Sequence, residues 1–272
     1  MTRYMGRLTI LGILLVVFLT MNCDSNPAES EIILELVWQD EFEGPAGQLP
    51  DPAKWGYDIG TDWGNAQLEY DTDRPENVSL DGDGNLAITA REESYMGQSY
   101  TSARIVTRDK FEPTYGRIEA RIKLPTGQGI WPAFWMLGND IETVGWPQCG
   151  EIDIMEYRGQ EPQIIHGSLH GPGYFGAEAL TSRFYLENGR FDTDFHVFAV
   201  EWRAGEIRWY VDDIRYFTIY PSQVSGEWVF DHPFYIILNV AVGGYFVGPP
   251  NSTTVFPQTM LIDYVKVYRE GN

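Results

Sequence analysis

Short segments in which apolar and polar residues alternate fill the chain beyond residue 35, separated by Gly, Pro, Asn and Asp. Tyr115–Leu124 is the clearest of them, and its period of two predicts a half-buried antiparallel strand. Residues 195–219 predict a meander, residues 234–242 a strand buried on both faces, and residues 260–268 a final strand. Many short strands with little helical periodicity predict an all-β fold of two stacked antiparallel sheets.

The domain organisation is simple. No internal repeat and no Gly/Ser-rich linker interrupts the sequence after residue 35. We therefore expect residues 35–272 to form a single domain, which is large enough to bury a core without disulfides.

The alternation breaks inside an acidic segment at residues 150–157, Gly-Glu-Ile-Asp-Ile-Met-Glu-Tyr. Successive side chains of a strand point to opposite faces, so Glu151 and Asp153 share one face, opposite to the two isoleucines. Glu156 would then fall among the aliphatic side chains, where an unpaired charge is costly. A β-bulge around Met155 would return Glu156 to the acidic face, and bulges are frequent beside active sites.

Carboxylates on one rigid face suit the hydrolysis of a glycosidic bond, in which one acts as nucleophile or base and another as acid. A third carboxyl between them would orient the nucleophile and separate the neighbouring pKa values. Two other interpretations stay open on these residues alone. An acidic strand face can be a solvated edge that resists aggregation, or it can bind calcium through its oxygens.

The charge of the chain restricts its partners. A formal net charge of −20 disfavours binding to nucleic acid or to an anionic membrane surface. We expect a neutral or cationic partner. Aromatic residues make up 14% of the chain and nine of them are Trp, which suggests that some rings contact a ligand as well as the core.

The N-terminus is typical of an export signal, which we assign to residues 1–22. Arg3 and Arg7 precede an apolar run from Leu8 to Leu19, which is short for a membrane span and has the length of a cleaved signal. Residues 23–34 are expected to form a polar leader before the domain.

The chain has two cysteines, Cys23 and Cys149, so a disulfide framework is excluded. Cys149 is expected to be a free buried thiol beside the acidic strand. Cys23 follows the apolar run after Thr20, Met21 and Asn22, a place that resembles that of the acylated Cys of a bacterial lipoprotein, but Asn22 stands where that signal has a small residue. We expect a secreted protein, with lipid anchoring at the cell surface through Cys23 as the alternative.

Three tryptophans flank the acidic segment. Trp131 and Trp135 share a face at period two, so their indoles could line one groove, although Trp135 could equally fill the core. Trp131 and Trp146 lie at expected strand ends, where exposed rings would offer flat apolar faces to sugar C–H groups. The polar candidates for hydroxyl recognition are Asn65, Arg91, Arg104 and His170, residue types that more often have structural or surface roles.

With these residues identified, the chain resembles glycoside hydrolase family 16 and, within it, the laminarinase branch. The resemblance rests first on Glu151-Ile-Asp-Ile-Met-Glu156, including the inserted residue. Further motifs follow in the family's order: Trp38-Gln-Asp-Glu-Phe42, Trp63-Gly-Asn65, Asp73-Arg-Pro-Glu-Asn-Val78, Trp131-Pro-Ala-Phe-Trp-Met136, Asn239-Val-Ala-Val-Gly-Gly244 and Asp263-Tyr-Val-Lys-Val-Tyr268. It implies a concanavalin-like β-jelly roll with an open cleft on the concave sheet, and endo-hydrolysis of β-1,3-glucan, often with mixed-linkage β-1,3-1,4-glucan.

The resemblance also implies roles for single residues. Glu151 matches the nucleophile, Asp153 the carboxyl that assists it, and Glu156 the general acid/base of a retaining double displacement. Trp131 and Trp146 match positions that line glucose-binding subsites. Weaker matches are Asn65, Arg91 and His170. The segment Gln67-Leu-Glu69-Tyr-Asp71 departs from the Glu-Leu-Gln-Tyr-Tyr of many relatives, which puts the subsites near this loop in doubt.

Family members often carry a structural calcium ion away from the cleft. Glu41 and Gly84, through their main-chain oxygens, and Asp263 occupy the corresponding positions, and an oxygen-only set suits calcium. Asp263 could instead be a plain outward residue on the last strand. No cofactor is expected to be needed for catalysis.

Two rival functions share the scaffold. One is a non-catalytic β-glucan-binding protein, which typically lacks one or both glutamates, whereas both are present here. The other is an enzyme of the same family that acts on agar, carrageenan or xyloglucan. The inserted Met155 argues against the xyloglucan and lichenase branches, whereas a galactan is harder to exclude. Nothing in the sequence requires more than a monomer.

Overall fold

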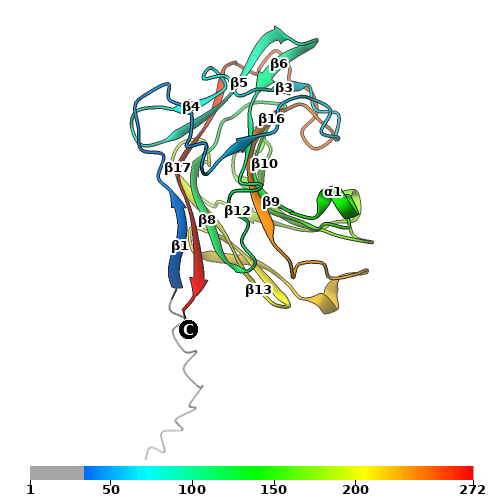
Figure 1. Cartoon of the computed structure of the whole chain (residues 1–272). Coiled ribbons are helices and arrows are strands. Elements are labelled where there is room, and N and C mark those ends of the chain that lie inside the picture. The colour runs from blue at the N-terminus through cyan, green and yellow to red at the C-terminus, as the bar shows by residue number, and fades with distance from the viewer. Residues whose placement is uncertain (1–33, 272) are drawn as a thin grey trace, which may run out of the picture. The chain divides into compact units, whose positions relative to one another are not determined.

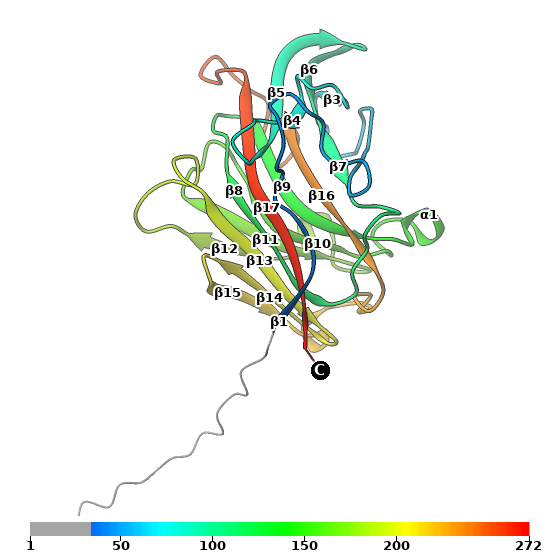
Figure 2. The same ribbon diagram turned by 60° about the vertical axis from the view of Figure 1, so that its left-hand side comes forward.

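Two β-sheets face each other across an apolar core in the computed structural model, which describes residues 34–271 (Figures 1 and 2). The fold is nearly all β, as predicted. Its first strand begins at Leu34, one residue before the expected start of the domain. The expected signal peptide, Cys23 and nearly all of the polar leader lie outside the described residues.

The first sheet has ten strands. Its main path is β15 (Ile214–Ile219), β14 (Glu206–Val211), β13 (His196–Arg203), β8 (Gly116–Lys123), β17 (Gln258–Glu270), β5 (Leu86–Tyr95), β6 (Gln98–Ser102) and β3 (Glu69–Asp71), while β1 (Leu34–Asp40) pairs with β17 and β4 (Val78–Leu80) with β5. The pairing of β3 with β6 is parallel, which corrects the expectation of wholly antiparallel sheets. The chain can make this parallel pair because it passes through β4 and β5 between the two strands.

The second sheet has seven strands and carries the acidic segment. Its order is β12 (Leu180–Tyr185), β11 (Ile164–His170), β10 (Glu151–Tyr157), β9 (Ile130–Gly138), β16 (Phe234–Val242), β7 (Arg104–Val106) and β2 (Gly56–Tyr57). The described helical segments are short: α1 (Ile141–Val144), η1 (Gly176–Glu178) and η2 (Pro221–Gln223). Among the described residues, no helix has the length and apolar character needed to cross a membrane.

Strand β8 shows how the alternation builds the core. Ile118, Ala120 and Ile122 are fully buried between the sheets. On the outer face Arg117 pairs with Glu119 at 2.7 Å, so this glutamate is buried without being an unpaired charge. The predicted strand is confirmed.

Strand β16 is buried at every position, as its continuous apolar run predicted. Its even-numbered residues from Ile236 to Val242 belong to the core between the sheets. Tyr235 and Ile237 join a second apolar cluster on the other face, and Ala241 joins a third with Trp131. The seven-stranded sheet is therefore apolar on parts of its second face as well. We call this second face, which points away from the core, the site face.

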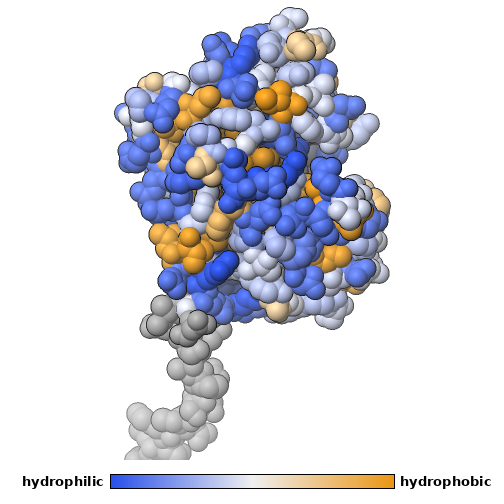
Figure 3. Space-filling model, viewed as in Figure 1, coloured by the Kyte–Doolittle hydropathy of each residue, from blue (hydrophilic) through white to orange (hydrophobic). Residues whose placement is uncertain are grey.

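The face of the molecule seen in Figure 3 is mostly hydrophilic, with small separate apolar areas. This agrees with the acidic composition and the formal net charge of −20. The acidic cluster lies on the site face, where polar side chains stand among apolar ones.

Candidate active site

Strand β10 contains one residue more than its neighbours over the same stretch of sheet. Glu151 pairs with His170 and Glu156 with His166 on β11, so five steps on β10 match four on β11. Strand β9 shows the same mismatch, because Leu137 pairs with Glu151 and Ala133 with Glu156. The register shifts lie after Asp153. The predicted β-bulge is confirmed.

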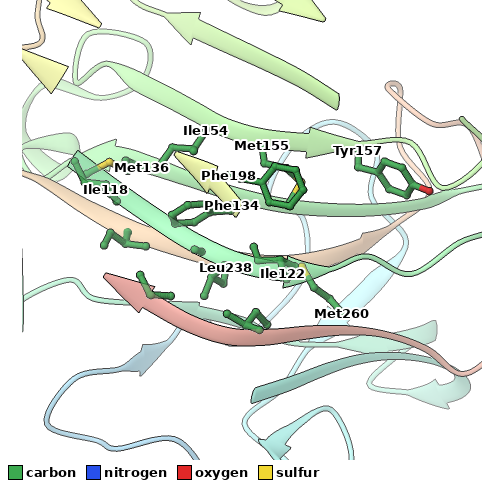
Figure 4. Close-up of a cluster of buried hydrophobic side chains, with 14 of the residues drawn as sticks. Ile118, Ile122, Phe134, Met136, Ile154, Met155, Tyr157, Phe198, Leu238 and Met260 are labelled. Atoms are coloured by element: carbon green, nitrogen blue, oxygen red, sulfur yellow. The ribbon is translucent and has the colours of Figure 1, made fainter. Parts of the chain in front are cut away.

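The side chain of the extra residue is buried in the core between the sheets. Ile154 and Met155 are consecutive, yet both lie in the apolar cluster between the sheets (Figure 4). Glu156 therefore returns to the site face, where Glu151 and Asp153 already lie. Asp153 is buried, whereas the two glutamates keep part of their surface. The bulge thus places all three carboxyl groups on one face.

Each glutamate is held by a tryptophan. The Trp146 indole N–H donates to Glu151 Oε2 at 2.9 Å, and the Trp131 indole N–H donates to Glu156 Oε1 at 3.2 Å. Ser168 Oγ adds a hydrogen bond to Glu156 Oε2 at 3.3 Å. Both glutamates are therefore oriented before any substrate binds.

His170 joins the middle of the acidic cluster. Its Nε2 lies 3.0 Å from Asp153 Oδ2 and 3.6 Å from Glu151 Oε1. Burial opposes the charged ring, but the hydrogen bond to Asp153 and the nearby carboxylates raise the pKa of His170 to about 10. The Gly176 amide opposes this charge, since it donates to Nδ1 at 3.1 Å and so favours the neutral ring. In either state Nε2 carries a proton, and this proton faces the Asp153 carboxylate.

The same three side chains have the spacing of a metal site. Ligand atoms of Glu151, Asp153 and His170 lie within 4.8 Å of one another. A metal ion would have to displace the proton on Nε2 that faces Asp153 Oδ2 at 3.0 Å. The ion pair between His170 and Asp153 therefore accounts for this spacing, and we assign no metal to it.

The electrostatics separate the two glutamates. Burial, followed by the charge of Asp153, raises the pKa of Glu156 to about 8. Burial and Asp153 also raise the pKa of Glu151, to about 7. The charge of His170 lowers both values, and the N–H of Trp146 lowers that of Glu151. A proton shared by the cluster therefore favours Glu156, and Glu151 ionises first.

The expectation of two exposed rings is correct for Trp146 and wrong for Trp131. Trp146 is 43% exposed, whereas Trp131 is only 8% exposed. The Trp131 ring packs against Phe246 at 5.1 Å and under Gly244, where a Cβ would lie 3.2 Å from the ring. The fold of the 243–248 loop over β9 covers Trp131, which the sequence pattern could not reveal.

Asn65 lies beside this tryptophan. Its main-chain oxygen accepts the amide of Tyr245 at 2.8 Å and lies 3.0 Å from the position of a Cβ on Gly244. Gly244 has a φ of 110°, which disfavours other residues there. The structure therefore places Asn65 next to the Trp131 side of the site.

Trp135 belongs to the site face and not to the core between the sheets. Its indole N–H donates to Asn239 Oδ1 at 2.8 Å, and the Arg104 guanidinium stands 4.8 Å from its ring. Arg104 also stands 5.0 Å from the Trp63 ring and pairs with Asp58 at 3.1 Å. These cation–π contacts join Trp135 of this sheet and Trp63 of the loop before β3 into a second aromatic group.

Arg91 is not brought into this arrangement. It lies on β5 in the ten-stranded sheet, and its ionic partner among the described residues is Glu93, at 4.0 Å. The assignment of Arg91 to substrate binding therefore has no support from its contacts.

Several residues at the site were missed by sequence reasoning. Ser168 and His166 alternate with His170 on β11, and this period of two could have placed all three on one face. His166 is buried opposite Glu156, and burial followed by the charge of Arg158 lowers its pKa to about 4, so it is neutral. Asn239, which holds Trp135, had no comparable local signal.

The departure at Gln67-Leu-Glu69-Tyr-Asp71 produces a second buried acidic pair. Glu69 Oε2 accepts the amide of Val242 at 2.8 Å, and Asp71 Oδ2 accepts the indole N–H of Trp63 at 2.8 Å. Burial raises the pKa of Glu69 to about 7, and burial with the charge of Glu69 raises the pKa of Asp71 well above its usual range. This pair therefore retains a proton near neutral pH.

The expected calcium ligands come from three adjoining segments. Asp40, just before Glu41, pairs with Val265, and Leu86, shortly after Gly84, pairs with Ile262. Asp263 lies between these two pairs, at a register shift of β17 against β8. Oxygen donors from three segments fit calcium.

The Asp263 carboxylate already has a cationic partner, because Arg121 Nη1 lies 2.5 Å from its Oδ2. The Glu41 carboxylate pairs with Lys266 at 2.8 Å, which leaves its main-chain oxygen as the possible ligand. Calcium would compete with Arg121 for Asp263 and stays a prediction.

Cys149 is a buried free thiol, as expected. Burial followed by the charge of Glu151 raises its pKa to about 12, so it is not a reactive thiolate.

Comparison with known proteins agrees with this geometry. The profile of "Glycosyl hydrolases family 16" matches residues 61–266. The "Beta-glucanase" of Rhodothermus marinus is 46% identical over 247 residues, covering 86% of this chain and 85% of the relative. The catalytic domain of an endo-1,3-beta-glucanase (laminarinase) from Thermotoga petrophila superposes with a TM-score of 0.84 at 47% identity, covering 89% of this chain and 100% of that one. The laminarinase from Rhodothermus marinus gives a TM-score of 0.83 at 43% identity, with 89% and 100% coverage. The chain is thus a glycoside hydrolase of family 16, with the jelly-roll fold of the laminarinases.

Proposed function

We propose that the protein is an endo-acting β-1,3-glucanase that also cleaves mixed-linkage β-1,3-1,4-glucan. The observation that carries the proposal is the bulge, which puts Glu151, Asp153 and Glu156 on one partly accessible face. The relatives named above act on β-glucans, and the high pKa of Glu156 beside an ionisable Glu151 suits an acid and a nucleophile.

In the first step, protonated Glu156 donates its proton to the glycosidic oxygen while the Glu151 carboxylate attacks the anomeric carbon. The C–O bond to the leaving sugar breaks and a glycosyl ester with Glu151 forms. Burial and Asp153 favour the proton on Glu156, and Trp146 orients Glu151 through its indole N–H. Asp153 does not bond to the substrate in this scheme.

In the second step, the Glu156 carboxylate takes a proton from water, and the resulting oxygen attacks the same carbon. The ester to Glu151 breaks, and the product keeps its original anomeric configuration. Asp153, paired with His170 Nε2 at 3.0 Å, acts on the nucleophile through its charge, which raises the pKa of Glu151.

The substrate contacts follow from the aromatic rings on either side of the carboxyl groups. Trp146 offers an exposed ring beside Glu151. Trp135 on β9, Arg104 on β7 and Trp63 in the loop before β3 offer a surface of rings and a cation. A neutral sugar polymer is not repelled by the net charge of −20, and apolar ring faces bind sugar C–H groups.

The test is product analysis. We expect oligosaccharides from laminarin and from lichenan, and none from agarose or xyloglucan. NMR of the first products should show the β-anomer. Release from agarose alone would favour the galactan alternative, binding to laminarin without cleavage would favour the glucan-binding alternative, and an α-anomer would contradict the double displacement.

We also propose export of the protein, because its polymeric substrate lies outside the cell and residues 1–22 have the pattern of a signal. Mass spectrometry of the mature N-terminus should show cleavage after residue 22. A diacylglycerol mass on Cys23 would identify the lipid-anchored alternative. We propose in addition that the protein is a monomer, which light scattering can check.

A further inference from the structure

A residue of the opposite sheet binds a main-chain carbonyl oxygen at the start of the bulge. The Trp209 indole N–H donates to the carbonyl oxygen of Asp153 at 2.8 Å. Trp209 lies on β14 of the ten-stranded sheet and is fully buried. The register of β10 shifts against both of its neighbours immediately after Asp153. This hydrogen bond therefore joins the two sheets at the first residue of the bulge.

The indole also packs directly on the strand beside β10. A Cβ on Gly167 of β11 would lie 2.7 Å from Trp209 Cδ1 and 2.4 Å from Tyr216 Oη. Gly167 stands between His166 and Ser168, whose side chains point to the site face. Only a glycine permits the Trp209 ring to come this close to the main chain of β11. Trp209 therefore contacts the main chain of β11 next to Ser168 and the main chain of β10 at Asp153.

The ten-stranded sheet also has an irregularity where Trp209 contacts β10 and β11. Trp209 pairs with Phe217 and Tyr210 with Arg215, so β15 has a bulge at Tyr216. Tyr216 directs its buried hydroxyl at Gly167, and the Phe217 ring lies 4.9 Å from that of Trp209. Two bulges, one in each sheet, thus meet at Trp209.

A buried N–H without a partner is costly, and so is a bulge carbonyl without a donor. Each group satisfies the other here. The bulge interrupts the pairing of β10 just after Asp153. The peptide at this point sets the directions of Asp153 and Glu156. We propose that Trp209 is a positioning residue that fixes the bulge and so holds Asp153 and Glu156 in their reactive arrangement. This inference rests on the proposed function, and Trp209 itself is separated from the substrate by β10.

The experiment compares two tryptophans of the same sheet. Trp209→Phe removes the indole N–H and keeps an aromatic ring. Trp202→Phe is the matched control, because Trp202 on β13 is also fully buried and its N–H donates to the carbonyl oxygen of Phe230 at 3.1 Å. Both variants should lose similar stability, measured as Tm. A shift of the reacting groups by about 1 Å can cost roughly 100-fold in rate.

We expect Trp209→Phe to lower kcat on laminarin by roughly 10- to 100-fold with KM nearly unchanged, and Trp202→Phe to change kcat by less than about threefold. The falling limb of the pH profile should also move to lower pH in Trp209→Phe, since Asp153 would raise the pKa of Glu156 less from a looser position. His170 and Glu151, the other charged groups that face Glu156, are unchanged in both variants.

Equal kcat values in the two variants would overturn the inference, as would a loss confined to KM. If Trp209→Phe does not fold, benzothienylalanine at position 209 replaces the N–H by sulfur and keeps the bicyclic ring. The same loss of kcat is then expected, and unchanged kcat would overturn the inference. The proposed function fails separately, when the wild-type protein itself cleaves no β-glucan.

Discussion

Ile154 and Met155 are neighbours in the chain, yet both side chains enter the core between the two sheets (Figure 4). Two consecutive inward residues are possible only because β10 has a bulge at this point. The bulge reverses the direction of every later side chain, and Glu156 reaches the site face for this reason. An apolar residue without chemistry of its own thereby completes the acidic cluster.

Deleting Met155 should remove the bulge and turn Glu156 toward the core. We expect kcat on laminarin to fall by at least about 100-fold, because the acid no longer lies beside the nucleophile. Met155→Leu is the control, since a swap of similar volume keeps the bulge and usually costs less than about 1.5 kcal/mol. Full activity in a folded deletion variant would contradict this role for Met155.

Removing the nucleophile should stop turnover and leave binding intact. For Glu151→Ala we expect kcat to fall by at least about 10⁴-fold, since the covalent intermediate cannot form. Affinity electrophoresis in laminarin should still show retardation. Glu178→Ala on the exposed η1 segment serves as the control and should be fully active. Substantial residual activity in Glu151→Ala would refute the assignment.

The activity should depend on pH with a bell shape. The rising limb reports ionisation of Glu151 and the falling limb loss of the proton from Glu156, whose pKa values are raised to about 7 and about 8. Ser168→Ala removes a hydrogen bond that lowers the pKa of Glu156, so the falling limb should move to higher pH. A shift to lower pH, measured on kcat/KM, would be inconsistent with this contact.

Glu69 should make the protein less stable as pH rises. Its pKa is about 7 in the folded protein against 4.5 ordinarily, so the folded state binds more protons and stability is lost between about pH 4.5 and 7. Glu69→Gln keeps an acceptor for the Val242 amide and removes the titration. We expect the free energy of unfolding of this variant to exceed that of the wild type by roughly 1 to 3 kcal/mol at about pH 8. At about pH 4 it should be no larger than that of the wild type.

Glu93→Gln is the control for this measurement, because its effect on the free energy of unfolding should depend on pH in the opposite direction. Hydrogen bonds from Thr101 and Arg74 lower the pKa of Glu93, so its contribution is present at neutral pH and lost in acid. Denaturant unfolding should therefore find Glu93→Gln less stable than wild type at neutral pH. A Glu69→Gln variant that behaved in the same way would disprove the proton retained at Glu69.

Calcium, if it binds at Glu41, Gly84 and Asp263, should stabilise the fold without taking part in catalysis. Binding at about 100 times Kd contributes about 2.7 kcal/mol, so chelation should lower Tm by roughly 5 to 10 °C. Asp263→Asn should weaken this response. Arg121→Gln should strengthen it, because the guanidinium no longer competes for Asp263. A Tm that does not change with EDTA would exclude the site.

The sequence by itself determined much of the fold. The period of two in β8 and the continuous apolar run of β16 fixed which faces are buried, because burial of apolar side chains dominates strand placement. The local cost of an unpaired charge was enough to predict the bulge before Glu156. These features depend on residues that are adjacent in the sequence, so the sequence alone is enough to predict them.

Only the tertiary structure decided which distant side chains meet. Trp131 is covered by a loop more than a hundred residues away in the sequence, and Arg91 is carried to the other sheet. The contact of Trp209 with Asp153 crosses the core between two strands whose separation no local pattern encodes. Periodicity specifies the face on which a side chain lies, whereas its partners depend on strand order, register and the packing of the two sheets.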